Sequence, residues 1–128
     1  MPERTAINPW TWSTQLGFDQ AQLVEGHRRQ LVASGQDAVD ADGSPQHPGN
    51  MAAQLELAID NLEAVLAAAD MTLTDVVRLT VYTTDVDELL KHWAGVTNRI
   101  QGFATSVLGV TQLAAPGLLV LLEATAVD

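Results

Sequence analysis

One stretch of the chain, residues 50–69, limits the possible folds more than any other. Its apolar residues recur at spacings of three and four, which predicts a helix with a single apolar stripe. The stripe consists of Met51, Leu55, Ala58, Ile59, Leu62, Val65, Leu66 and Ala69. Asn50 stands where an N-cap is expected. Such a helix is roughly 29 Å long at about 1.5 Å per residue, so its stripe needs another long element to cover it.

Alternating apolar and polar residues predict strands on both sides of this helix. The clearest runs from Val76 to Thr83, with Leu79 and Val81 on one face. Before the helix, two short β-type runs between Gln20 and Gln36 flank Gly26, which predicts a hairpin. After it, the stretches 106–113 and 118–127 predict two closing strands, with Ala115-Pro116-Gly117 as the turn between them.

A second helix is expected between the strand 76–83 and the closing strands. Thr84-Asp85-Val86-Asp87 offers capping side chains, and helical spacing continues up to Gly102 through Leu89, Trp93, Val96 and Ile100. The resulting order, ββ-α-β-α-ββ, favours an α+β fold with the helices on one face of the sheet. The length of 128 residues suits one domain spanning 1–128.

Charge and composition exclude several classes of function. Six Lys and Arg against sixteen Asp and Glu give a net charge of -10, so we expect neither a nucleic-acid nor a membrane partner. The chain has no cysteine, and no basic n-region precedes an apolar run, so we expect a cytoplasmic protein without a signal peptide. Hydrophobic residues reach 47% with only 17% charged, which indicates a surface hidden in an oligomer. The tryptophan-containing segment 8–12 is expected to be an ordered, packed arm.

No motif in the chain predicts a metal site or an activated serine. The histidines lack metal-ligand spacing, the aspartates before Gly43 lack the EF-hand pattern, and no GxSxG is present. We therefore expect no bound metal. The residues considered are His27, His47 and His92, with Asp37, Asp40 and Asp42.

Three positions invite a functional interpretation. Glu123 lies inside the most apolar strand, where it is either an outward-facing residue or an acid/base group in a cleft. Arg78, in the strand 76–83, raises the same question and can equally pair with an acid at an oligomer interface. Gly35, after Ser34, either lets a ligand approach the backbone or forms a bulge or turn.

An ordered set of segments resembles the RidA/YjgF family, also called the Rid family. The matching segments cover residues 16–127 and are Val32-Ala33-Ser34-Gly35-Gln36, Ala53-Gln54, Asp60-Asn61-Leu62-Glu63-Ala64-Val65-Leu66, Asp75-Val76-Val77-Arg78-Leu79-Thr80-Val81-Tyr82-Thr83-Thr84-Asp85, Gly109-Val110, Leu113 and Glu123-Ala124-Thr125-Ala126-Val127. No single segment is decisive, but their order along the chain is specific.

The resemblance implies a chorismate-mutase-like fold, in which a sheet packs against two helices. It also implies a homotrimer with a central barrel and three clefts between subunits, each binding a small molecule. Characterised relatives hydrolyse enamines and imines such as 2-iminobutyrate to ketoacids and ammonia, without a metal or organic cofactor. Some relatives carry older labels such as endoribonuclease, which the charge of -10 does not support here.

The sequence departs from the deaminase pattern at the substrate site. Thr105 stands where the resemblance places an arginine that clamps the substrate carboxylate. Phe18 takes the place of a tyrosine, and Trp93 falls near a cleft asparagine. Glu123 matches the family glutamate thought to activate water. The resemblance therefore predicts a more apolar cleft that keeps one acid.

Three hypotheses follow from this pattern. In the first, the protein hydrolyses an enamine, imine or related carbonyl compound lacking a free carboxylate. Glu123 would be the catalytic base, and substrate would be bound by Thr105, Ser106, Phe18, Trp93, Ser34 and Gly35. In the second, a non-catalytic trimer binds a small ligand or a partner. In the third, ordinary 2-iminoacid deamination persists, with Arg78 or a neighbouring subunit's arginine holding the carboxylate.

Overall fold

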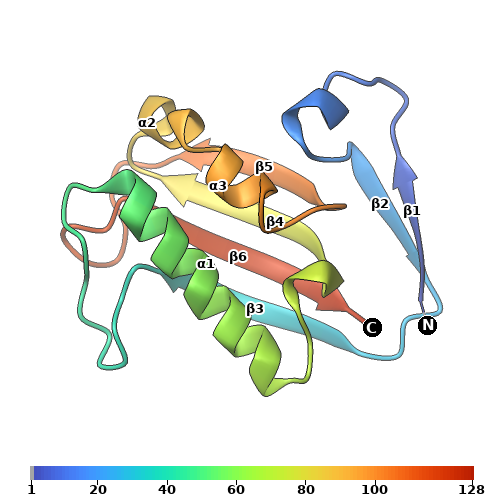
Figure 1. Ribbon diagram of the computed structural model, residues 1–128, viewed down its shortest axis with the longest axis horizontal. Helices are drawn as coiled ribbons and strands as arrows, with labels where there is room; N and C mark the ends of the chain where they lie inside the picture. The colour runs from blue at the N-terminus through green and yellow to red at the C-terminus, as the bar shows by residue number, and fades with distance from the viewer. Residues whose placement is uncertain (1) are drawn as a thin grey trace.

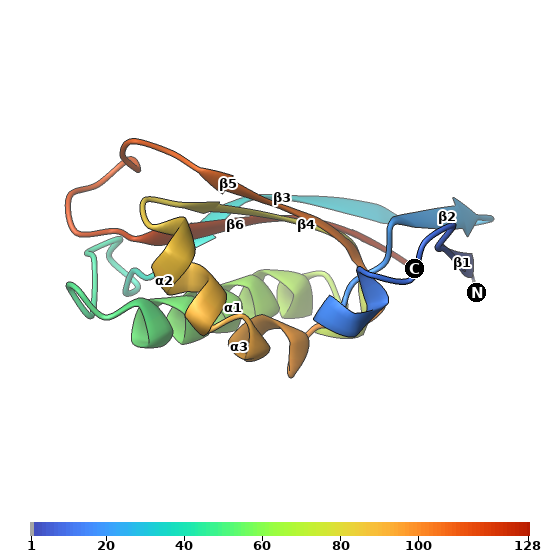
Figure 2. The same ribbon diagram turned by 90° about the horizontal axis from the view of Figure 1, so that it is seen from above.

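The computed structural model describes residues 2–128 and consists of a four-stranded sheet with its helices on one face (Figures 1 and 2). The sheet order is β3-β6-β4-β5, and only the β4–β5 pair is parallel. A two-stranded ribbon, β1-β2, forms a separate sheet. In chain order the strands are β1 (Glu3–Ile7), β2 (Ala21–Glu25), β3 (Gln30–Asp37), β4 (Val76–Thr83), β5 (Ala104–Gly109) and β6 (Val120–Val127). The helices are α1 (Met51–Ala68), α2 (Val86–Lys91) and α3 (Ala94–Thr97), with 3-10 turns at Thr14–Leu16 (η1) and Leu73–Asp75 (η2).

Helix α1 forms where the apolar stripe predicted it. Asn50 caps it, since its side-chain oxygen accepts a hydrogen bond from the Ala53 amide at 3.1 Å. Leu55, Ile59 and Leu62 are buried against the sheet, where Leu79 of β4 and Leu122 of β6 face them within one core cluster. The opposite face of the sheet carries no helix (Figure 2).

Gln54 is a fully buried polar side chain of α1 and connects the helix to two loops. Its amide nitrogen donates to the carbonyl oxygens of Gln46 at 3.2 Å, His47 at 3.2 Å and Gly117 at 2.7 Å. Its carbonyl oxygen accepts from the Leu119 amide at 2.8 Å. The side chain thus satisfies partly buried backbone groups before α1 and at the entry to β6.

The hairpin predicted between residues 20 and 36 is wrong, although both of its strands exist. Strand β2 pairs with β1, which the sequence did not predict, and not with β3. The guanidinium of Arg4 in β1 holds the ribbon against the end of β4, donating to the carbonyls of Val76 at 3.0 Å and Gly102 at 2.6 Å. Gly26, at φ +66°, redirects the chain out of the ribbon and toward β3.

The second predicted helix is split into α2 and α3. Asp85 caps α2 by accepting from the Glu88 amide at 3.1 Å, as its position suggested. At the junction the hydrogen bonds follow an i to i+3 pattern, with the Gly95 amide donating to the His92 carbonyl at 2.9 Å, before i to i+4 bonds resume at Thr97. Gly95 is a poor helix former, which weakens this stretch. Arg99 then ties it to α1 through ion pairs with Glu56 at 3.1 Å and Asp60 at 2.7 Å.

The first closing strand starts and ends earlier than predicted, the second starts two residues later but ends at Val127 as predicted, and the two are not adjacent in the sheet. β5 stops at Gly109, and β4 lies between β5 and β6, so the two are not neighbours. The tryptophans of the N-terminal segment are also more exposed than expected, with Trp10 at 63% and Trp12 at 55% of their surface accessible. No helix among the described residues is long and apolar enough to cross a bilayer.

Replacing Gln54 by Leu should lower the free energy of unfolding by about 2–4 kcal/mol, because four partly buried backbone groups would lose their only side-chain partner. Urea denaturation of Gln54→Leu against wild type measures this change. Gln112→Leu, at an exposed position, is the matched control and should stay within about 0.5 kcal/mol of wild type. Equal stability of Gln54→Leu and wild type would contradict the assigned role.

Candidate functional site

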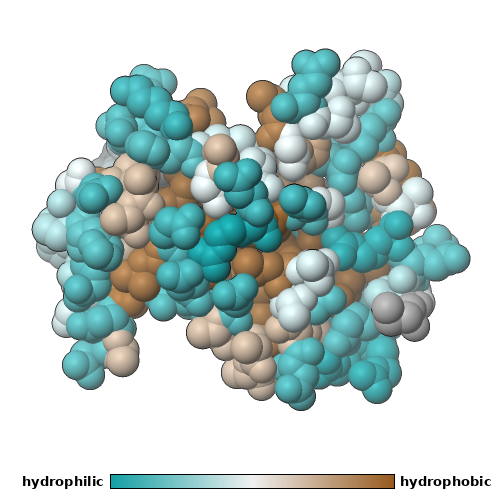
Figure 3. Space-filling model, viewed as in Figure 1, coloured by the Kyte–Doolittle hydropathy of each residue, from teal (hydrophilic) through white to brown (hydrophobic). Residues whose placement is uncertain are grey.

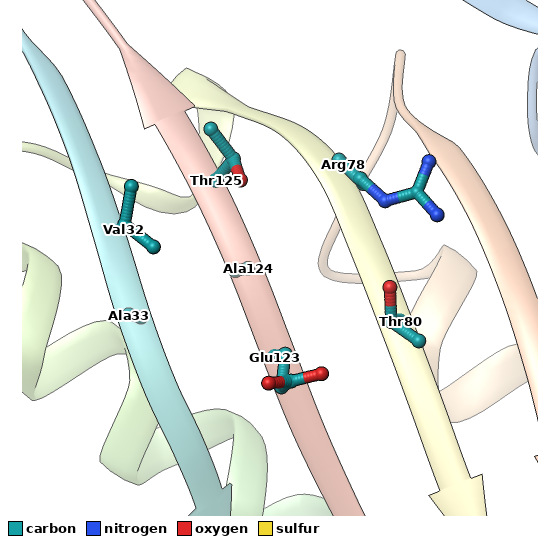
Figure 4. A pocket seen from close by; sticks show the side chains of 7 residues that line it. All are labelled: Val32, Ala33, Arg78, Thr80, Glu123, Ala124 and Thr125. Carbon is teal, nitrogen blue, oxygen red and sulfur yellow. The ribbon is translucent and has the colours of Figure 1, made fainter.

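The bare face of the sheet carries a row of polar side chains from its two central strands. Arg78, Thr80 and Tyr82 alternate along β4 and pair in register with Thr125, Glu123 and Leu121 of β6. Glu123 therefore faces outward from the apolar strand and is exposed in the isolated chain. This matches the first of the two interpretations of Glu123, an outward-facing residue. Figure 4 shows Glu123 beside Thr80 on this face, with the Arg78 guanidinium directed toward β5.

Arg78 and Glu123 border the same shallow hollow, of about 150 Å³, but do not pair. Within residues 2–128 the Arg78 guanidinium makes no ion pair. Glu123 instead affects the pKa of its neighbour Tyr82. Its pKa is raised above its ordinary value, first by hydrogen bonding to the Glu123 carboxylate and then by desolvation.

A β-bulge places Ser34 and Gly35 opposite Glu123. In the β3–β6 pairing, Ala33 matches Ala124 and Gln36 matches Leu122, so two residues of β3 face the single residue Glu123. A side chain at Gly35 would come within 2.7 Å of the Leu121 methyl carbons, so glycine fits here without moving Leu121. Of the open alternatives for Gly35, the structure shows a bulge, and this bulge brings Ser34 and Gly35 to the predicted acid.

A second group of predicted residues forms a separate recess at the β5 edge. Phe18, Trp93 and Thr105, which are far apart in the sequence, line it together with Leu16, Leu90 and Val107. Its volume is about 390 Å³. In Figure 3 the outline is notched between α2 and the segment that joins β1 to β2, with hydrophobic atoms on both sides of the notch.

Local structure explains why these side chains meet. The indole nitrogen of Trp93 donates to the Leu16 carbonyl at 2.8 Å, which fastens the break between α2 and α3 to the η1 turn. The amide of Asp19 donates to the Phe103 carbonyl at 2.9 Å, which holds Phe18 next to the start of β5. Thr105 pairs with Leu79, and so it points to the helix side of the sheet, whereas Ser106 pairs with Thr80 and lies on the bare face.

The predicted site residues therefore form two groups in one chain. Phe18, Trp93 and Thr105 line the recess, while Glu123, Ser34 and Gly35 lie together on β6 and β3, across β4 from Ser106. Thr80, Tyr82 and Val107 were not predicted as site residues. Strand alternation could have indicated them, because residues two positions apart in a strand lie on the same face. Thr80 follows Arg78 at this spacing, Tyr82 follows Thr80, and Val107 follows Thr105. No cluster of three or more potential metal ligands occurs within the part of the chain that is described.

The mixed sheet with helices on one face, and with an acid on the bare face, defines an α+β protein of the RidA/YjgF type. The chain belongs to this family: the family described as Endoribonuclease L-PSP matches residues 16–128. Among curated relatives, the RutC family protein YjgH of Escherichia coli K12 is 35% identical over 78% of this chain and 75% of its own length.

Solved structures agree with this assignment. The Rid family protein YyfB of Yersinia pestis, described as of unknown function, is 34% identical with a TM-score of 0.87, and the match covers 98% of both chains. A member of the YjgF/YER057c/UK114 family from Mycobacterium tuberculosis is 32% identical over 98% of this chain and 100% of its own, with a TM-score of 0.63. The expected α+β fold of RidA/YjgF type is thus confirmed.

The single tyrosine of the chain allows the Glu123 environment to be measured directly. Titration of the phenolate absorbance should give a midpoint above the usual value of about 10 for Tyr82, because the nearby carboxylate favours the protonated hydroxyl. Glu123→Gln should move this midpoint downward, whereas Glu88→Gln on α2 should leave it in place. An unchanged midpoint in Glu123→Gln would show that the two side chains do not interact.

Proposed function

We propose that the protein hydrolyses a small enamine or imine, releasing ammonia, in clefts formed between copies of the chain in a homotrimer. The observation that supports this most is the arrangement of the predicted residues in two half-sites. Phe18, Trp93 and Thr105 form an apolar recess without an acid, while Glu123 stands on a bare sheet face beside only a shallow hollow. Each half lacks what the other provides, so a second copy would complete the site.

The bare sheet face has the properties of a surface that another subunit covers. Val32 is 74% exposed and Leu108 42% exposed, and both lie among the outward-facing residues of the sheet. Packing such faces around a threefold axis would form the barrel that the family resemblance implies, with the helices outside. Cytoplasmic location stays a prediction from the sequence.

The proposed reaction needs one side chain that first accepts a proton from water and then donates a proton to the leaving nitrogen. The Glu123 carboxylate accepts a proton from water as the water oxygen bonds to the imine carbon, giving a carbinolamine. The protonated Glu123 then returns a proton to the nitrogen. The C–N bond breaks and ammonia leaves, while the hydroxyl proton passes to the Glu123 carboxylate and the carbonyl forms; release of that proton to water restores the base. Water supplies the oxygen atom and the protons that balance the reaction, so neither an oxidant nor a reductant is required.

Thr105 sets the expected substrate preference. A neutral hydroxyl cannot form the charge-assisted pair that an arginine makes with a carboxylate, and the recess contains no cation to replace it. The proposed substrate therefore lacks a free carboxylate. Within the same chain Arg78 offers no substitute, since it lies on the other face of the sheet from Thr105.

Imine hydrolysis should depend on Glu123 and respond to Thr105. With 2-iminobutyrate generated in situ, we expect slow ammonia release by wild type and at least about tenfold faster release by Thr105→Arg, because a buried charge-assisted pair contributes about 1.5–3 kcal/mol. An imine of similar size without a carboxylate should be the better wild-type substrate. Glu123→Gln should abolish both activities, and Glu88→Gln should abolish neither.

If wild type and Thr105→Arg both fail on imines with and without a carboxylate while remaining folded and trimeric, the protein is a binding trimer and not a hydrolase. Fast wild-type turnover of 2-iminobutyrate would instead show that another group holds the carboxylate.

Complementation between two inactive variants tests the shared cleft. Glu123→Gln removes the acid, and Val107→Phe fills the recess, so each variant alone should be inactive. Unfolding and refolding an equimolar mixture should restore about a quarter of wild-type activity, because that fraction of interfaces receives an intact half from each copy. Sedimentation of wild type should show a trimer. No recovery from mixed trimers would place both halves of the site within one chain.

A further inference from the structure

The recess at the β5 edge has very few polar groups, and their hydrogen-bonding roles are fixed. Among the six side chains that line it, only Trp93 and Thr105 carry polar atoms. The remaining walls are Leu16, Phe18, Leu90 and Val107. The side-chain hydrogen bonds open to a ligand head group therefore depend on what Trp93 and Thr105 can still offer.

Trp93 offers nothing polar to a ligand. Its indole has a single N–H and no acceptor. That N–H donates to the Leu16 carbonyl at 2.8 Å. Only the aromatic face of the ring remains, and such a face attracts flat apolar groups and cations.

Thr105 retains acceptor capacity and no donor. A hydroxyl has one proton and two lone pairs. The Thr105 proton is donated to the Leu79 carbonyl at 2.6 Å, a short bond between neighbouring strands that the β4–β5 register places side by side. The oxygen that faces the recess can therefore only accept a hydrogen bond.

We propose that the recess selects a ligand with an apolar body and one N–H or O–H donor, as in an amine, an iminium or an alcohol, and disfavours carboxylates. This deepens the proposed function, on which it rests, because it directs the nitrogen end of an imine toward Thr105. A carboxylate would face the Thr105 lone pairs with no free side-chain donor among the lining residues, so it would regain little of the hydration it loses. The net charge of -10 and the aromatic walls favour a cationic donor further.

Matched one-ring probes test this selection without any catalysis. Benzylamine, benzyl alcohol, benzyl methyl ether and phenylacetate share one body and differ in the head group. Affinities from ¹H–¹⁵N NMR titration of the full chain should rank both donors about threefold to tenfold above the ether, with phenylacetate weakest. The shifted resonances should include the Trp93 indole N–H. Tightest binding of phenylacetate, or equal binding of the alcohol and the ether, would overturn the proposal.

Two substitutions at one position separate the hydroxyl from the shape of the recess. Thr105→Val keeps the shape and removes the acceptor, so the alcohol and the ether should bind equally. Thr105→Ser keeps the hydroxyl and should keep the ranking. A ranking that persists in Thr105→Val would place the acceptor elsewhere. The wild-type ranking alone decides the matter if a variant does not fold.

The outcomes also distinguish this inference from the proposed function. Donor selectivity in a protein that hydrolyses no imine overturns the proposed reaction and leaves the recess chemistry standing. Imine hydrolysis without donor selectivity overturns the recess chemistry alone.

Discussion

The burial of α1 on one face of a four-stranded sheet is the constraint on which the rest of the structure depends. The helix has a single apolar stripe, so it covers one sheet face and leaves the other bare. Strand alternation then divides the side chains of β4 and β6 into a core set and an outward set. Glu123, Thr80 and Arg78 belong to the outward set for this reason alone. A single helical layer thus creates both the core and the polar face where the candidate acid lies.

Local periodicity predicted the elements that depend on near neighbours. Strand β4 has the predicted bounds, and α1 begins after the predicted cap at Asn50, because hydrophobic spacing and capping are local properties. Pairing partners depend on distant groups and were not predictable. The β1–β2 ribbon is held by Arg4, which bonds carbonyl groups up to 98 residues away. No feature of residues 20–36 indicates that contact, and two β-type runs that flank a glycine predict a hairpin when they are considered alone.

The candidate site divides in the same way. The sequence could indicate Glu123, Thr105, Phe18 and Trp93 individually through the family resemblance. Where each side chain points depended on the register between strands. Because Thr105 pairs with Leu79 and Ser106 with Thr80, these adjacent residues serve opposite faces of the sheet. The bulge at Ser34 and Gly35 is likewise a matter of register between β3 and β6, which composition cannot reveal.

The recess, the helix break and the N-terminal ribbon form one arrangement. A continuous helix from residue 86 to 100 would carry Trp93 in regular helical geometry; the break at His92 sets its indole against the η1 turn instead. That turn is positioned by the ribbon, through the bond from the Asn8 amide to Asp19 at 2.9 Å and the Arg4 contacts to β4. Both side-chain donors of the recess are engaged in the bonds that build it. The walls that shape the recess therefore also decide its chemistry, since a polar group used to hold the fold together is no longer free to bind a ligand.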